Sequence, residues 1–94
     1  MKNANEQKDD FKAGDLVRFQ SRKILMHGPS AFIFDEATEN WLVPEQFIGE
    51  MHGIILISHF DFGRYYSEKP YVVFSNNRTF LVFGKYAALE KLEP

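Results

Sequence analysis

The chain has 94 residues, a formal net charge of −2 and no cysteine, so disulfide bonds and thiolate metal sites are excluded. This length allows one domain with a single hydrophobic core. Hydrophobic residues make up 45% of the chain, which argues against disorder, and the nearly neutral charge argues against a protein built to coat nucleic acid.

The first ten residues are polar and charged and show no apolar periodicity. They lack the apolar core of a secretory signal, and no apolar run in the chain approaches the roughly 20 residues of a membrane-spanning helix. We therefore expect residues 1–10 to form a flexible arm and residues 11–94 to form one domain. We also expect a cytoplasmic protein without membrane contact, located in the host cytoplasm or the virion if it is viral.

Residues 16–22 predict the first strand, because apolar and polar residues alternate. One face carries Val17 and Phe19, and the other carries Leu16, Arg18 and Gln20. Residues 23–26 extend this strand after a bend. The sequence His27-Gly-Pro-Ser30 predicts a turn, since Gly-Pro interrupts helices and strand ladders. Residues 31–34 then predict a second strand that pairs back as a hairpin.

Residues 35–50 form an acidic region without a basic residue, which we interpret as a loop or insertion. Its first part, residues 35–40, suits a helical turn with Asp35 as N-cap, and residues 41–43 equally suit a short strand. We favour a loop with one helical turn, held to the core by Trp41 and Leu42.

The chain is organised around residues 53–62 and the hairpin that follows them. Four branched aliphatic residues, 54–57, predict a strand that is buried on both faces and continues to Phe62. Two β-forming runs in residues 71–83 flank Asn-Asn, which tolerates the positive φ that two-residue hairpin turns require. Residues 85–92 predict either one or two helical turns or a short turn followed by a strand at 89–92.

Five short motifs occur in an order typical of a known family: Lys12-Ala-Gly-Asp-Leu-Val17, Gly53-Ile-Ile-Leu56, Tyr71-Val-Val-Phe74, Phe80-Leu-Val-Phe83 and Ala88-Leu-Glu-Lys-Leu92. This order resembles SH3-like small β-barrels of the KOW and Tudor type, and it is similar to small bacteriophage accessory or virion proteins. The resemblance implies a mainly β fold: a small SH3-like barrel or a strongly bent antiparallel sheet with one or two short helical turns. The long segment between Val17 and Gly53 departs from a minimal barrel of this type.

The sequence offers little that suggests catalysis. His52 and His59 lie about 20 Å apart if the strand between them is extended, so they cannot share a metal ion. There is no nucleophile elbow and no glycine-rich phosphate loop. The pair His59 and Asp61 is the remaining enzymatic candidate. We therefore expect a protein without metal, cofactor or enzymatic activity.

Aromatic and basic residues gather in and beside the connection at residues 63–70. They favour a protein-binding loop next to an exposed strand edge, and its expected contact residues are His59, Arg64, Tyr65, Tyr66, Lys69 and Tyr71. The expected partner is another protein, a larger assembly or a second copy of the chain. The alternative is a KOW-type nucleic-acid-binding module associated with transcription or translation, which would use Arg18, Arg22, Lys23 and Arg78.

Overall fold

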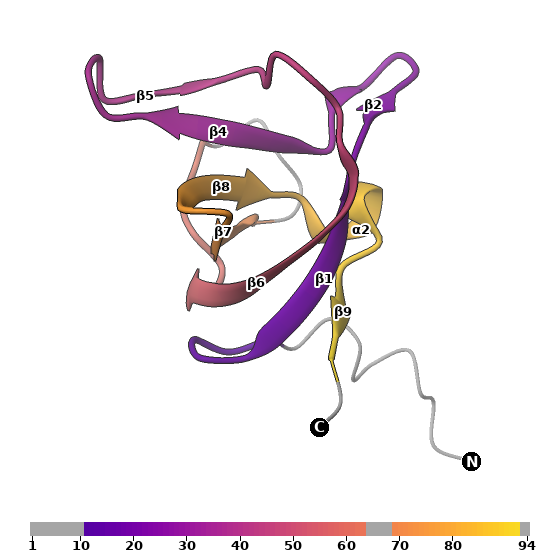
Figure 1. Cartoon of the computed structure of the whole chain (residues 1–94), viewed down its shortest axis with the longest axis vertical. Helices are drawn as coiled ribbons and strands as arrows, with labels where there is room; N and C mark the ends of the chain where they lie inside the picture. The colour runs from indigo at the N-terminus through magenta and orange to yellow at the C-terminus, as the bar shows by residue number, and fades with distance from the viewer. Residues whose placement is uncertain (1–10, 64–68, 93–94) are drawn as a thin grey trace.

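The computed structural model describes residues 11–63 and 69–92, and strands dominate these ranges (Figure 1). Seven strands form one antiparallel sheet in the order β5-β4-β8-β7-β6-β1-β9, and β2 and β3 form a separate ribbon. The strands are Leu16–Ser21 (β1), Lys23–Ile24 (β2), Gly28–Pro29 (β3), Ala31–Asp35 (β4), Asn40–Leu42 (β5), Gly49–Ile57 (β6), Tyr71–Ser75 (β7), Arg78–Val82 (β8) and Glu90–Lys91 (β9). The helix α2 spans Gly84–Ala87. These elements confirm the mainly β fold class.

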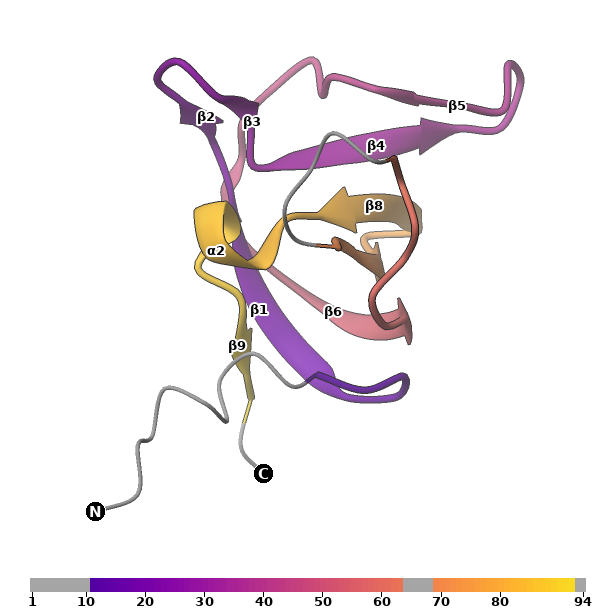
Figure 2. The same ribbon diagram turned by 180° about the vertical axis from the view of Figure 1, so that it is seen from behind.

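Strand β6 bends the sheet because it pairs with different neighbours along its length. Its first part, from Gly49 to Ile54, lies opposite β1, and its last part lies opposite β7. The register shifts between Ile55 and Ile57, and such a bulge bends a strand and increases its twist. As a result the β4–β5 hairpin crosses above β1 and β6 (Figures 1 and 2). Among the described residues the sheet does not close into a barrel, since β5 and β9 remain its two ends.

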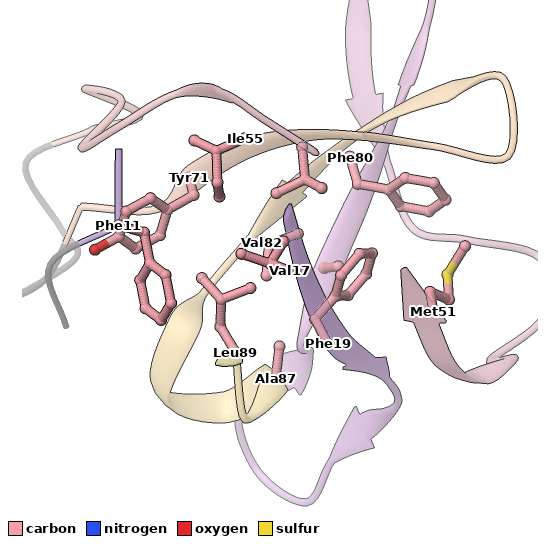
Figure 3. Close-up of a cluster of buried hydrophobic side chains, with 12 residues drawn as sticks. Phe11, Val17, Phe19, Met51, Ile55, Tyr71, Phe80, Val82, Ala87 and Leu89 are labelled. Atoms are coloured by element: carbon pink, nitrogen blue, oxygen red, sulfur yellow. The ribbon is translucent and has the colours of Figure 1, made fainter. Parts of the chain in front are cut away.

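The main core fills the inside of this bend (Figure 3). Strand β1 contributes Val17 and Phe19, which are completely buried, and its alternation is the one that the sequence predicted. The ring of Phe19 packs against that of Phe80 on β8, with the centroids 5.8 Å apart. Helix α2 adds Ala87 to this core. The core therefore joins strands from both halves of the chain.

The β7–β8 hairpin is buried on both faces except near its turn, where Phe74 is 40% exposed. Val73 and Val82 point into the main core, whereas Val72 and Leu81 belong to a second cluster on the opposite face. Half-buried aromatic side chains pack against this second cluster, and we call them the aromatic layer: Phe32, Trp41, Phe60, Phe62 and Tyr86. Asn76 and Asn77 have φ angles of 52° and 62°, so the predicted two-residue turn is confirmed.

The prediction that residues 54–57 form a strand buried on both faces is wrong. Ile55 is buried, but Leu56 and Ile57 each expose 45% of their surface. Strand β6 ends at Ile57 rather than at Phe62. The reason lies in the segment that follows, because Phe60 and Phe62 pack against the β7–β8 hairpin and leave the outer face of β6 uncovered.

The expected hairpin between the first two strands is also wrong. Strand β4 pairs with β5 and β8, and β1 pairs instead with β6 and β9. Between β1 and β4 the chain forms the β2–β3 ribbon, whose base is held by Ser30. The Ser30 hydroxyl donates to the Gln20 carbonyl (2.6 Å) and accepts from the Arg22 amide (2.9 Å). These bonds hold Ser30, the residue before β4, beside the end of β1.

In two places the structure decides between alternatives that the sequence left open. Residues 35–42 form the β4–β5 hairpin instead of the favoured loop with a helical turn, so Trp41 lies in a strand. Asp35 fixes the turn, because its carboxylate accepts from the Thr38 hydroxyl (2.6 Å) and amide (3.2 Å). At the C-terminal end, the short helix α2 is followed by strand β9.

Gly53 lies where β6 and β7 approach each other closely, and it provides a test of this packing. A Cβ atom at this position would lie 2.5 Å from the Phe74 carbonyl oxygen and 2.7 Å from Val73 Cγ1. We expect Gly53→Ala to lower the free energy of unfolding by about 1–3 kcal/mol, because β6 and β7 would have to separate. Urea unfolding followed by circular dichroism measures this loss.

The matched control is Gly63→Ala, where a Cβ atom would meet nothing within 4 Å. This variant should unfold at the wild-type urea concentration. Equal urea midpoints for the two variants would show that β6 and β7 do not pack closely at Gly53.

Candidate interaction site

The structure brings together three of the six residues that the sequence assigned to partner binding. His59, Lys69 and Tyr71 line a hollow of about 230 Å³ together with Phe11, Gly84, Lys85 and Leu89, and we call it the His59 hollow. Arg64, Tyr65 and Tyr66 lie outside the described residues. These three residues thus lie close together, and their role in partner binding stays a prediction.

Tyr71 forms the floor of the His59 hollow and belongs mainly to the core. It is 5% exposed, and its ring meets the Phe11 ring edge-on at 5.4 Å. His59, which has a positive φ of 57°, also packs against Tyr71, and the centroids of the two rings lie 5.2 Å apart. The lining of the hollow thus combines one histidine and two lysines with aromatic and aliphatic side chains.

The basic residues assigned to nucleic-acid binding do not gather at one place. Arg18, Arg22 and Lys23 follow one another along β1 and β2, whereas Arg78 lies at the β7–β8 turn. Arg18 donates from Nε to Glu90 (2.6 Å), and this bond together with the charge of Glu90 raises the pKa of Arg18. Nucleic-acid binding stays a prediction, and these positions add no support to it.

Arg22 is also engaged within the molecule, because its Nε donates to the Tyr86 carbonyl oxygen (3.0 Å). The Tyr86 ring stacks on His27 in the turn of the β2–β3 ribbon, with centroids 4.9 Å apart. Arg22 and His27 therefore connect the ribbon to the C-terminal part of the chain.

An exposed polar cluster lies where β1 and β6 pair. Arg18 stands opposite His52 in the register, and Glu50 is two residues before His52 on the same face. His52 Nε2 lies 2.9 Å from Glu50 Oε2, and Arg18 lies 3.9 Å from the same oxygen. The hydrogen bond with His52, followed by the charge of Arg18, lowers the pKa of Glu50. This cluster neutralises the charge of Arg18 locally.

A run of exposed apolar side chains lies in the region that the sequence assigned to an acidic loop. Strand β5 is one end of the sheet and pairs with β4 alone. Four apolar residues in and after β5 expose between 41% and 58% of their surface: Leu42, Val43, Phe47 and Ile48. Their exposure is unusual because they follow one another within a single short segment.

A hollow of about 360 Å³ lies beside this segment, and we call it the β5 groove. Its apolar walls come from the connection between β5 and β6 and from two further strands: Leu42, Val43, Pro44, Ile48, Ile33 and Phe80. Ser21, the last residue of β1, also lines it. Residues of β4, β5 and β8 therefore share the groove with the end of β1. In Figures 1 and 2 the outer side of β5 is uncovered.

Sequence reasoning missed this groove, although part of its signal was present. Residues 41–43 have strand propensity and stand directly before Pro44, a residue that disrupts strands and helices. The position of β5 at the end of the sheet follows from the pairing of β4 with β8, more than forty residues later in the chain. No local pattern reports such a pairing.

Comparisons with known proteins identify no relative: no family model matches the chain, and neither a curated protein nor a solved structure is significantly similar to it. Within residues 11–63 and 69–92, no three His, Asp or Glu side chains are grouped as metal ligands. In the same ranges, no helix has the length and apolar character to cross a membrane. A functional proposal therefore depends on the geometry of the surface.

The lowered pKa of Glu50 predicts how stability depends on pH. The folded-state pKa lies below the ordinary value of 4.5, so the charged carboxylate stabilises the fold above pH 4.5. That contribution is lost as the pH falls through the lowered pKa. We expect wild type to be more stable than Glu50→Gln at pH 7, and the difference to shrink at pH 3.5. Urea midpoints at both pH values measure it.

Glu45→Gln removes an exposed carboxylate five residues away and serves as the control. Its midpoint should follow that of wild type at both pH values. A difference for Glu50→Gln that does not change with pH would show that the carboxylate charge plays no part.

Proposed function

We propose that the protein is a non-enzymatic protein-binding module that accepts an extended segment of its partner along β5. One observation carries the proposal: a strand at the end of the sheet stands beside an open groove whose walls are partly apolar and partly charged. A terminal strand presents backbone groups that pair readily with another chain, and many proteins bind peptides in this way.

The side chains of β5 favour specific binding over simple exposure of an edge. Leu42 lies directly opposite Ile33 in the register, and both line the β5 groove. Trp41 points to the opposite face and packs in the aromatic layer. The centroid of its ring lies 5.0 Å from that of Phe34 on β4. Side chains of an added strand would alternate between the two faces in the same way. Every second side chain would therefore point to the face of the sheet that carries Leu42 and borders the groove.

The His59 hollow supports the same function as a second contact for a larger partner. Its lining of one histidine and two lysines differs in chemistry from the apolar walls of the β5 groove. Two chemically different contacts on one small domain favour attachment to a larger assembly. The resemblance to small bacteriophage accessory and virion proteins supports this version of the proposal, in which the chain is a structural component of such an assembly.

A charge on β5 should block binding, because a lysine on an edge strand opposes the addition of another strand. Peptides selected from a random display library on wild type should bind Leu42→Lys about tenfold more weakly or worse. Fluorescence anisotropy with the selected peptides measures the affinities.

Leu25→Lys is the matched control, since Leu25 is 83% exposed in the turn between β2 and β3. It introduces the same charge away from β5 and should leave binding unchanged. Selected peptides that bind both variants equally well would contradict the assignment of β5, and a library without binders would contradict the proposed function.

A further inference from the structure

We infer that the partner segment is a short apolar, β-branched strand with lysine or arginine at both of its ends. This inference rests on the proposed function and specifies the chemistry of the ligand at the same site. It follows from where the charges lie around β5, at its two ends and along its exposed apolar middle.

Acidic residues stand at both ends of β5. Asp35, Glu36 and Glu39 lie at the turn that precedes it, and Glu45 lies just beyond it in the wall of the β5 groove. Residues 35–50 contain no basic residue. Arg78 is the basic residue in the lining of the groove, so acidic groups outnumber it there.

The contacts of these acids leave their charge in place. The carboxylate of Asp35 is bonded by the hydroxyl and the amide of Thr38, which are neutral donors. Glu36, Glu39 and Glu45 are exposed. The surface at β5 therefore combines an apolar middle with negative charge at each end, and the complementary ligand has an apolar middle with positive ends.

The length of β5 sets the length of the apolar part. Three residues, Asn40–Leu42, cover about 10 Å at roughly 3.3 Å per residue. A partner strand that pairs with all three places its own flanking residues near the turn at Glu39 and near Glu45. Basic side chains at those flanks meet the acids, and β-branched side chains between them suit a strand beside Leu42 and Val43.

Two other occupants fit less well. A second copy that paired antiparallel through its own β5 would place the acidic turn of each copy beside Glu45 of the other, and like charges at close range oppose association. The first ten residues of the same chain contain two lysines against three acidic residues and no branched aliphatic residue. A second copy therefore lacks the positive ends that the surface calls for, and the first ten residues lack the apolar middle.

Two synthetic peptides with blocked termini test the inference directly: Lys-Lys-Val-Ile-Val-Lys-Lys, and Glu-Glu-Val-Ile-Val-Glu-Glu. Wild type should bind the lysine peptide at least about tenfold more tightly than the glutamate peptide. Its affinity should fall as salt is added, since the charges involved are exposed. Amide shifts in a titration followed by nuclear magnetic resonance should centre on residues 40–48.

A single charge reversal supplies the matched control. Glu45→Lys should weaken the lysine peptide by about three- to tenfold and strengthen the glutamate peptide. Glu90→Lys, at an exposed position on β9 at the other end of the sheet, makes the same change of charge and should leave both affinities unchanged.

The outcomes separate the inference from the proposed function. The inference is overturned if both peptides bind β5 equally well, or if only uncharged display-selected peptides bind there. The proposed function as a protein-binding module is retained in both cases. If light scattering shows that the wild type dimerises and Leu42→Lys prevents it, a second copy is the occupant and the inference is overturned. If no peptide and no second copy perturbs the amides of residues 40–48, both the inference and the proposed function are overturned.

Discussion

Burial of the β7–β8 hairpin on both faces is the constraint on which the rest of the structure depends. Val73 and Val82 require a core on one side, and Val72 and Leu81 require a cover on the other. Strands β1, β4 and β6 provide the core by wrapping around one side. The aromatic layer provides the cover. A chain this short has few remaining residues with which to close the sheet, so the burial of one hairpin leaves other surfaces open.

The open surfaces follow from that use of the chain. The segment after β6 covers the β7–β8 hairpin and not β6 itself, so Leu56 and Ile57 remain exposed on β6. The β4–β5 hairpin contributes Phe32 and Trp41 to the aromatic layer through one face, and its other face borders the β5 groove. The same pair of strands thus completes the core cover and creates the candidate binding edge.

Charge has two different roles on the two sides of the domain. Near β1 and β6, Arg18 is paired with Glu90 and lies close to Glu50, so basic and acidic groups compensate each other locally. Around β5, acidic groups are exposed beside apolar side chains and receive no comparable compensation from residues 35–50. The net charge of −2 does not reveal this difference, because it sums the balanced charges near β1 and β6 and the unbalanced acidic charges around β5.

The sequence by itself determined what depends on neighbouring residues. Alternation in residues 16–21 specified which face of β1 is buried, and the Asn-Asn pair specified a hairpin turn, because strand period and turn geometry are local properties. It also placed His59, Lys69 and Tyr71 near one another, since they flank one short connection. Only the tertiary structure decided that β7 and β8, rather than residues 54–57, are buried on both faces, and that β5 ends the sheet beside the β5 groove. Those outcomes depend on the pairing of β4 with β8 and on where Phe60 and Phe62 pack, and such long-range contacts are set by competition among many apolar surfaces for the same core.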